Sequence, residues 1–227
     1  MNFLEFIKEN KLRIISIIIF FLTIKFAVYY HSYHYWLKAP KQISQDFEFS
    51  RPDNRPDEIK GEIVTLRRLR PEYIKDYHKM ISVPIVTKPL YYPTRPSLEF
   101  IQNRLKRELA REAKGDTFLY MVFDNKENKL VGSVEIREKN PKDPGQFSCW
   151  MNDKYWGGGR FQEAVKLITT EYFKVKNVPS FNAHIETWNL RSFYALKKAG
   201  FKLIDLYYPE GQKSRYILEF YNPNQQK

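Results

Sequence analysis

The sequence predicts a mixed α+β domain that follows one transmembrane helix. Alternating, β-branched stretches and stretches with helical spacing take turns from Gly61 to Tyr221, and strand hairpins are expected at both ends of this region. A long apolar run near the N-terminus has the length of a membrane span. We therefore expect a membrane anchor at 1–36, a linker at 37–60, a domain with a mixed, mostly antiparallel sheet at 61–221, and a tail at 222–227.

The N-terminal apolar run, Leu12 to Tyr30, predicts a single membrane-spanning helix. At about 1.5 Å per residue its length is close to the hydrocarbon thickness of about 30 Å. A cleaved signal peptide is an alternative, but the run ends on bulky residues instead of an Ala-x-Ala pattern. A buried helix is a second alternative, although the run is apolar all round. An interfacial aromatic belt is expected from Tyr29, Tyr30, Tyr33, Tyr35 and Trp36.

The order of elements in the domain follows from periodicity and from proline and glycine positions. A first strand is expected over 62–69, and Pro71 opens a helix that includes Met80. Four prolines between 84 and 96 predict a loop, and Ser97 caps a helix whose charged face is expected to be solvated. Further strands are expected over 117–123, 129–138, 146–152, 181–187, 202–208 and 214–221, and further helices after the glycines at 157–159 and over 190–199.

Three consecutive glycines, Gly157, Gly158 and Gly159, lie between a predicted strand and a predicted helix. Glycine permits positive φ angles and lets the backbone approach a ligand closely. The unpaired amides and the dipole at the start of a helix favour an anion there. A pyrophosphate is therefore the expected ligand, and a glycine-rich turn without a ligand is the alternative.

The spacing around these glycines excludes two common phosphate loops. The P-loop needs Lys followed by Ser or Thr after its second glycine, and neither pair is present here. The dinucleotide motif needs a glycine or alanine at the position that Gln162 occupies. The loop must therefore belong to another class of phosphate site if it binds a ligand.

The residues around the glycines resemble the acetyl-coenzyme A loop of the GNAT superfamily of N-acetyltransferases, and are most similar to the branch that acetylates the N-terminal alanine of ribosomal proteins. That loop reads Gln/Arg-x-x-Gly-x-Gly/Ala, and Lys154, Gly157 and Gly159 fall on it. Lys154 departs from the usual Gln or Arg. Phe161 is bulky where relatives usually have a small residue, which would narrow the pantetheine end of the pocket.

Three further stretches resemble the same family in the same order. Leu66-Arg67 is similar to its opening strand and Leu130-Val131-Gly132-Ser133 to its central strand. Asn189-Leu190-Arg191-Ser192 and the later Gly200-Phe201 are similar to its Asn-x-x-Ser helix. The resemblance covers residues 61 to about 220. It implies acetyl-coenzyme A as co-substrate and a primary amine as acceptor: a protein N-terminus, a lysine or a small amine.

The resemblance also implies which residues contact the co-substrate. The loop amides would bind the pyrophosphate, and the pantetheine arm would lie along the central strand and the strand after it. Asn189 has a second interpretation as the N-cap of its helix. The expected contact residues are Lys154, Tyr155, Trp156, Gly157, Gly158, Gly159, Arg160, Phe161, Asn189 and Ser192.

Acetyl transfer to an amine requires a proton acceptor for the amine and a proton donor for the leaving thiolate. Glu135 is the first candidate base and Glu186 the second, and for each the alternative is a carboxylate that points into solvent. Many GNAT enzymes carry an acid tyrosine where this chain has Leu196; the ribosomal-protein branch has a serine that Ser192 matches. Ser192 is therefore the candidate acid. No metal is expected, because no cluster has metal-ligand spacing.

Composition limits the class of partner. The formal net charge is +12, which could attract anionic lipid, an acidic protein or ribosomal RNA. No recognisable nucleic-acid motif accompanies this charge, so we expect no direct nucleic-acid partner. The one cysteine, Cys149, excludes an intrachain disulfide and is expected to be a core residue in a reducing compartment.

These observations lead to one hypothesis and one alternative. The hypothesis is a membrane-tethered, acetyl-coenzyme A-dependent N-acetyltransferase. The alternative is a catalytically silent GNAT-like module that binds coenzyme A or a protein at the membrane, which Lys154, Phe161 and Leu196 motivate. The positive residues on the two sides of the predicted span are nearly balanced and do not orient it. The domain is expected to face the cytoplasm because acetyl-coenzyme A must reach it.

Overall fold

The computed structural model describes residues 23, 55–138, 145–208 and 213–225. The chain divides into two units, Met1–Phe47 and Glu48–Lys227. Of the first unit only Thr23, an exposed helical residue, is described, so the predicted anchor at 1–36 and most of the predicted linker lie outside the described residues. Within the described ranges, none of the helices has the length and apolar character to cross a membrane.

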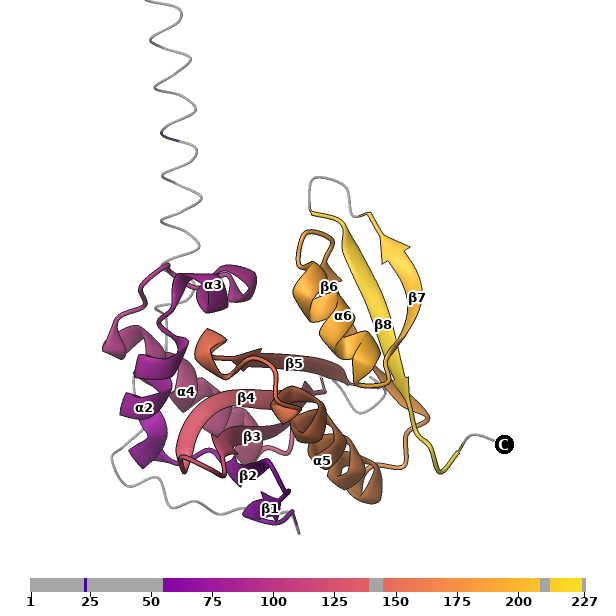
Figure 1. Cartoon of the computed structure of the whole chain (residues 1–227), viewed down its shortest axis with the longest axis horizontal. Coiled ribbons are helices and arrows are strands. Elements are labelled where there is room, and N and C mark those ends of the chain that lie inside the picture. Colours follow the sequence, from indigo (N-terminus) through magenta and orange to yellow (C-terminus); the bar gives the residue numbers. More distant parts are fainter. Residues whose placement is uncertain (1–22, 24–54, 139–144, 209–212, 226–227) are drawn as a thin grey trace, which may run out of the picture. The chain divides into compact units, whose positions relative to one another are not determined.

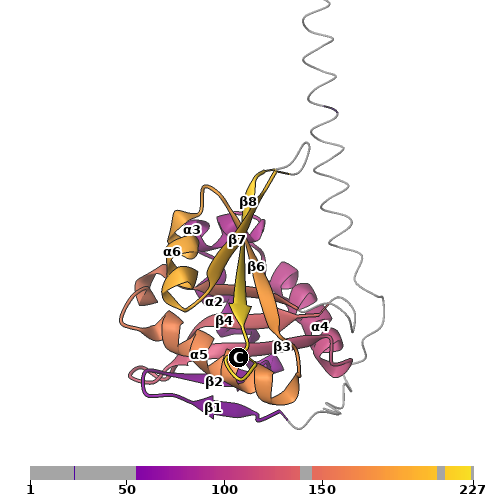
Figure 2. The same cartoon turned by 90° about the vertical axis from the view of Figure 1, so that its right-hand side faces the viewer.

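The described part of the second unit is built on one sheet of eight strands in the order β1-β2-β3-β4-β5-β6-β8-β7 (Figures 1 and 2). Neighbouring strands are antiparallel except for β5 and β6, which are parallel. This confirms the predicted mixed, mostly antiparallel sheet. The strands are β1 Glu58–Lys60, β2 Val64–Arg68, β3 Thr117–Asp124, β4 Lys129–Arg137, β5 Gln146–Met151, β6 Ser180–Glu186, β7 Lys202–Tyr207 and β8 Arg215–Tyr221.

Helices cover the sheet on both sides (Figure 1). On one side α2 and α4 pack on β3 and β4, and on the other side α5 packs on β2, β3 and β4 and contacts α6. The helices are α2 Ile74–Ile81, α3 Pro84–Thr87, α4 Leu98–Ala113, α5 Arg160–Val175 and α6 Leu190–Lys198, with short 3-10 turns η1 Pro71–Tyr73, η2 Lys88–Leu90 and η3 Asp153–Tyr155.

Strand alternation divides the apolar residues between two cores. Every residue of the central strand β3 is buried; Tyr120 and Val122 belong to the core under α5 and α6, whereas Leu119 and Met121 belong to the core under α2 and α4. A period of two sends successive side chains to opposite faces, so one central strand supports both cores.

The structure differs from the sequence-based prediction at three places. The proline-rich stretch was expected to be a loop, but Pro84 and Pro89 lie in the first turn of the short helices α3 and η2, where a missing amide hydrogen costs nothing. Residues Glu58–Lys60, expected in the linker, pair with β2 as strand β1. The helix after Pro71 begins as a 3-10 turn and becomes α-helical at Ile74.

The parallel pair β5 and β6 is joined only at its start. Gln146 pairs with Asn182 and Phe147 with Ala183, and the rest of β5, as far as Met151, has no partner on β6. Over the same stretch β6 pairs along its whole length with β8. In Figure 1, β5 crosses the picture while β6 and β8 rise away from it. The two strands therefore diverge towards their C-terminal ends, next to the triglycine loop.

Candidate active site

The divergence of β5 and β6 leaves main-chain groups of both strands facing each other across the opening. The Asn152 amide donates to the Val131 carbonyl at 2.8 Å, and pairing alternates along an antiparallel ladder. The main-chain groups of Cys149 and Met151 therefore face away from β4, towards β6. Directly after β6, the Thr187 amide donates to the carbonyl of Ser214, the residue before β8, at 3.2 Å, and this turns the main chain of Glu186 towards β5. The Met151 carbonyl accepts the Trp156 indole and the Glu186 carbonyl accepts the Asn189 amide, so an extended ligand could pair with the Cys149 main chain and with the Met151 amide.

The triglycine loop has the conformation that the sequence predicts. The φ angles of Gly157, Gly158 and Gly159 are 87°, 61° and 77°, a region that residues with a Cβ rarely adopt. The first bond of helix α5 runs from the Glu163 amide to the Gly159 carbonyl at 2.9 Å. Within the described ranges, the amides from Gly157 to Gln162 have no hydrogen-bond acceptor. This leaves a row of donors at a helix N-terminus, which is an anion-binding arrangement.

Two contacts hold this loop against the sheet. The Arg160 Nε donates to the Asp124 carboxylate at 2.5 Å. Although burial opposes ionisation of Asp124, the hydrogen bond from Arg160 lowers the pKa of that carboxyl below its ordinary value. The Glu163 side chain accepts hydrogen bonds from three successive amides, those of residues 62–64, at 2.7–2.9 Å. The first turn of α5 is thus bound to the β3–β4 turn and to the approach to β2.

The start of α6 contacts the same loop. The Trp156 indole donates to the Met151 carbonyl at 2.9 Å, and the Arg191 guanidinium lies 3.6 Å from the centre of the Trp156 ring. Asn189 caps the helix, because its side chain accepts the Ser192 amide at 3.3 Å, which confirms the N-cap interpretation. The half-buried Ser192 therefore lies on the α5–α6 side of the sheet.

A groove of about 480 Å³ runs between α5, the end of α6 and the chain after β8. Its apolar lining includes Phe173 and Phe220, and three lysines, Lys166, Lys174 and Lys198, supply positive charge. Gln162, which follows the glycine loop, lies at one end of α5 in this lining. The groove thus begins beside the anion-binding amides and is itself cationic, although the sequence-based reasoning did not identify it.

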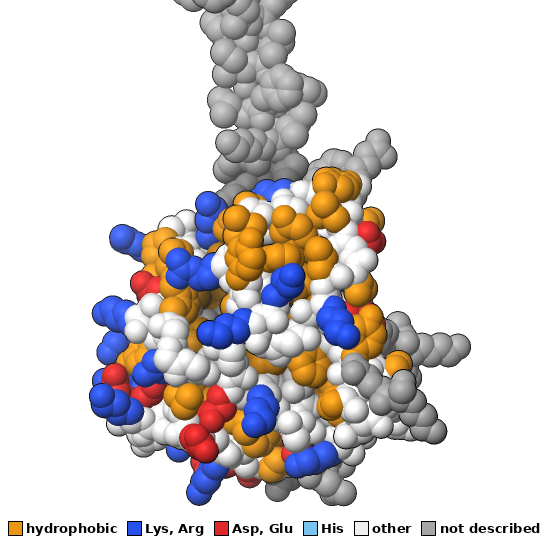
Figure 3. Space-filling model, turned by 45° about the vertical axis from the view of Figure 1, so that its right-hand side comes forward, with side chains coloured by type: hydrophobic (Ala, Val, Ile, Leu, Met, Phe, Trp, Pro, Cys, Tyr) orange, Lys and Arg blue, Asp and Glu red, His pale blue; other side chains and the backbone are white. Residues whose placement is uncertain are grey.

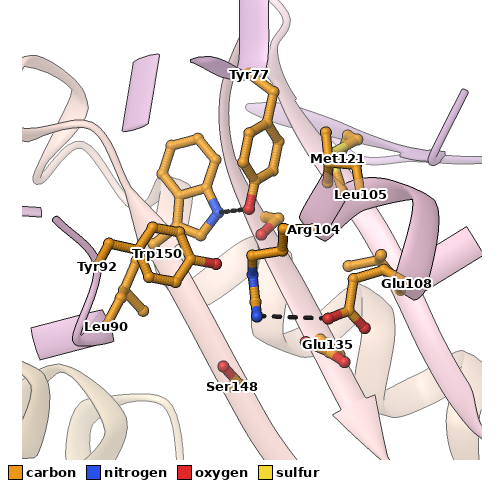
Figure 4. A pocket seen from close by; sticks show the side chains of 12 residues that line it. Tyr77, Leu90, Tyr92, Arg104, Leu105, Glu108, Met121, Glu135, Ser148 and Trp150 are labelled. Atoms are coloured by element: carbon orange, nitrogen blue, oxygen red, sulfur yellow. Dashed lines mark hydrogen bonds and ion pairs between the residues drawn. The ribbon is translucent and has the colours of Figure 1, made fainter. Parts of the chain in front are cut away.

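Glu135 lies on the opposite side of the sheet, beside a cavity of about 20 Å³ (Figure 4). Its Oε1 accepts the Thr117 hydroxyl at 2.9 Å and the Arg137 guanidinium at 2.6 and 2.9 Å. Its other oxygen, Oε2, has no hydrogen-bond partner among the residues described. Ser148, directly opposite Glu135 on β5, also lines the cavity. A space of this size holds about one water molecule.

The cavity wall contains a charged cluster that the sequence-based reasoning missed. Glu108 was expected on a solvated helix face, but it is only 3% exposed and bonds Arg137 of β4 at 3.2 Å. Figure 4 shows Arg104 reaching the same carboxylate, at 3.5 Å. At the far wall the Trp150 indole donates to the Tyr77 hydroxyl at 3.0 Å, and burial raises the pKa of Tyr77 to about 12.

Glu186, the second candidate base, is buried at the end of β6 and faces the same side of the sheet as Glu135. Its Oε2 accepts the Trp188 indole and lies 3.6 Å from the Lys213 ammonium. Its Oε1 is buried and has no partner among the described residues. Neither carboxylate is therefore the solvent-facing group that was the alternative to a catalytic role.

The remaining sequence candidates occupy different surroundings. Lys154 is exposed, whereas Tyr155 and Phe161 pack partly on the core under α5. Burial raises the pKa of the Cys149 thiol to about 12, which suits the expected core role. Leu196 is buried in the core under α5 and α6. Across 55–138, 145–208 and 213–225, no three His, Cys, Asp or Glu side chains come together as metal ligands.

Comparison with known structures places the fold. An acetyltransferase from Bacillus anthracis, described as GNAT family, is 20% identical with a TM-score of 0.61 and covers 72% of this chain and 98% of its own. The ribosomal-protein-S5-alanine acetyltransferase of Vibrio fischeri is 18% identical with a TM-score of 0.62, and the match covers 75% of this chain and 99% of that protein. The spermidine N-acetyltransferase of Vibrio cholerae, in complex with CoA and spermine, is 14% identical with a TM-score of 0.59, and the match covers 71% of this chain and 96% of that protein.

At these identities the solved structures establish the fold alone. No curated protein matches the chain in sequence. The family model for the acetyltransferase (GNAT) domain matches residues 64–202, which is more than half of the chain. The chain therefore belongs to the GNAT family of acetyltransferases.

Proposed function

We propose that this enzyme transfers the acetyl group of acetyl-coenzyme A to a primary amine, and that its N-terminal segment tethers it to a membrane. The observation that carries the first part is the row of amides from Gly157 to Gln162, which have no acceptor within the described residues. They lie at a helix N-terminus beside two diverging strands. A diphosphate fits these donors.

The rest of coenzyme A fits the surroundings of the loop. The pantetheine arm has amide groups that can pair with the main chain of Cys149 and with the amide of Met151 in the opening between β5 and β6. The adenosine and its 3′-phosphate fit the groove between α5 and α6, where Lys166, Lys174 and Lys198 supply positive charge. The three phosphates would then lie near one helix N-terminus and three lysines.

The groups that we propose for proton transfer and for stabilising the leaving sulfur lie on opposite sides of the sheet. The amine nucleophile must lose a proton, and Glu135, which lines the cavity, would accept it directly or through one water. The carbonyl carbon then exchanges its bond to sulfur for a bond to nitrogen. Ser192 would donate a hydrogen bond to the departing sulfur from the α6 side, and a β5 amide would stabilise the carbonyl oxygen.

Two relatives support an amine acceptor without naming the one used here. The Vibrio fischeri neighbour is a ribosomal-protein alanine acetyltransferase, and the Vibrio cholerae neighbour acetylates spermidine. The sequence resemblance to the ribosomal-protein branch favours a protein N-terminus. A lysine and a small amine remain acceptors of the same chemical class.

The tether rests on the sequence of residues 12–30, an apolar run with the length of a membrane span. A cytoplasmic position of the domain follows from the location of acetyl-coenzyme A. Carbonate extraction of membranes from cells that express the full chain tests the span, because only an integral protein stays in the pellet. Release into the supernatant would overturn the tether and leave the transferase proposal standing.

A pair of glycine substitutions tests the assignment of the loop. Gly157 and Gly115 have nearly equal φ angles, 87° and 79°, and a Cβ at either would meet no atom within 4 Å. Gly157→Ala and Gly115→Ala therefore cost the fold a similar strain of about 1 kcal/mol. Only Gly157→Ala puts a methyl group where the diphosphate approaches. We expect it to raise the Kd for acetyl-coenzyme A at least about tenfold, while Gly115→Ala leaves the Kd unchanged. Equal affinities would show that the loop does not bind the diphosphate.

A catalytically silent coenzyme A-binding module is the second candidate, because Leu196 occupies the position of the family's acid tyrosine and is buried. Calorimetric titration with acetyl-coenzyme A, followed by thiol release with a panel of amines, separates the two. Binding without thiol release on any amine would favour the silent module.

A further inference from the structure

Exposed hydrophobic side chains gather on α6 and β7. We call this group the α6–β7 surface, and its members are Leu190, Tyr194, Leu203, Ile204 and Leu206. Tyr194 is the most exposed of them, at 64%. Figure 3 shows hydrophobic side chains gathered in the upper half of one face, with lysines and arginines between them. Apolar groups collected in this way mark an interaction site more often than scattered ones do.

The register of the sheet shows that the β7 residues share a face with α6. Leu203 pairs with Leu218 and Leu206 with Tyr216. The Tyr216 ring lies 4.5 Å from the ring of Phe193 on α6, and Phe193 in turn contacts Tyr194 at 5.2 Å. Side chains opposite each other in a sheet lie on the same face. Leu203 and Leu206 therefore lie on the face of the sheet that α6 covers.

The edge of β7 is poorly suited to pairing with another strand. The register shifts between Leu203 and Asp205, which makes Ile204 an irregularity in the strand. The Asp205 carboxylate also accepts the amide of Leu206 at 2.7 Å, so this amide is already used. Bulges and charges on an edge strand act against edge-to-edge association. The surface offers its side chains, and not its main chain, to a partner.

Lys197 of α6 borders this surface, and its ammonium lies 5.7 Å from the Phe193 ring. Lys202 pairs with Glu219 and lies over the Tyr221 ring on the opposite face of the sheet, so it is not part of this border. Aliphatic and aromatic side chains beside a lysine are typical of surfaces that enter the headgroup region of a bilayer. Anionic lipids add an attraction for such a lysine.

We propose that the α6–β7 surface docks on the surface of a membrane that contains anionic lipids. The occupant is suggested by the chain itself, since the apolar run at 12–30 precedes the domain by only residues 31–54. A random coil of that length spans about 27 Å. A tether of this reach gives a high effective concentration, so a weak interfacial affinity suffices. The inference rests on the proposed tether.

Hydrogen exchange of the full chain in vesicles tests the docking. The vesicles contain phosphatidylglycerol and phosphatidylcholine in equal parts, or phosphatidylcholine alone, and sedimentation first reports whether the chain is bound at all. We expect the amides of residues 190–207 to exchange about tenfold more slowly on the anionic vesicles than in detergent. A double change of Tyr194→Ser and Leu203→Ser should remove this protection. Val175→Ser changes an exposed valine at the end of α5 and should leave the protection of residues 190–207 unchanged.

Two lysine variants test the electrostatic part without changing the apolar residues. Lys197→Gln should lower the docking equilibrium about fivefold on anionic vesicles and leave it unchanged on phosphatidylcholine. Lys202→Gln is the control, because Lys202 lies on the other face of the sheet, and it should leave the equilibrium unchanged on both kinds of vesicle. Sedimentation without protection of 190–207 would overturn the docking and leave the tether standing. Failure of the chain to sediment with the vesicles would overturn both the docking and the tether. Protection that depends on protein concentration in detergent would show that a second copy of the chain covers the surface, and would also overturn the proposal.

Discussion

The carboxylate of Asp124 accepts the Nε–H of Arg160 at 2.5 Å, and this contact joins the β3–β4 turn to the first residue of α5. Asp124 is almost fully buried. It also accepts the amide of Glu127 at 2.9 Å within its own turn. One side chain therefore fixes the hairpin turn and also the start of the helix whose amides form the candidate diphosphate site.

Asp124→Asn should destabilise the domain, because it keeps the shape of the side chain but removes the charge that pairs with Arg160. We expect a loss of about 2 kcal/mol in the free energy of unfolding at neutral pH. Urea unfolding measures it. Glu171→Gln is the matched control, since Glu171 pairs with the exposed Lys174 at 3.1 Å, and such surface pairs contribute about 0–1 kcal/mol.

The pH dependence of this loss follows from the direction of the pKa shift. The pKa of Asp124 is lower in the folded protein than its ordinary value of 3.8. Its stabilising contribution is therefore fully present above that value and is lost as the pH falls through the folded pKa. The wild type and Asp124→Asn should approach equal stability in strong acid. A difference that persists there would contradict the ion-pair explanation.

The lysines of the α5–α6 groove should distinguish coenzyme A from dephospho-coenzyme A, which lacks the 3′-phosphate. Lys166 and Lys198 line the groove that begins beside the glycine loop. We expect the wild type to bind coenzyme A about tenfold more tightly, and Lys166→Gln with Lys198→Gln to remove most of that preference. Calorimetric titration of the wild type and of the double variant with each ligand measures how much of this preference the two lysines supply. The preference should weaken in high salt.

The control for the groove is Lys106→Gln, which removes one exposed positive charge from α4 without touching the groove. It should leave the preference unchanged. Equal affinities of the wild type for both ligands would show that the groove does not hold the 3′-phosphate. The glycine-loop assignment would be unaffected, because it has its own test.

The triglycine loop was predictable from sequence because its determinants are local. Positive φ angles need glycine, and a strand before and a helix after fix where the amides point. Asn189 was predictable for the same reason, since a cap involves residues three apart. By contrast, a three-residue edge strand such as Glu58–Lys60 has too little pattern of its own. It is held by pairing with β2 and by a 2.8 Å ion pair between Glu58 and Arg67.

The cluster around Glu135 could not be predicted because its members are distant in sequence. Glu108 and Glu112 look like the charged face of an exposed helix, but they are buried against Arg137 of β4 and Arg68 of β2. A buried carboxylate needs such a partner. Only the folded sheet brings those arginines to α4, so helical periodicity alone gives the wrong exposure.

Glu135→Gln should lower kcat more than Glu186→Gln does, if Glu135 accepts the proton of the amine. We expect a loss of about 10²-fold or more for Glu135→Gln, because the amide cannot take the proton. The KM for acetyl-coenzyme A should change little, since the candidate loop and groove lie on the other side of the sheet.

A purely structural role of Glu135 would give a different set of results. Its Oε1 bonds Thr117 and Arg137, so a structural defect would lower the melting temperature and raise KM together with any loss of kcat. Thr117→Val removes one of these bonds and leaves the carboxylate in place, so it should lower stability with little loss of kcat. If Glu186→Gln alone loses kcat, the base is Glu186, whose buried Oε1 has no partner among the described residues. Unchanged rates in both variants would show that neither carboxylate is the base.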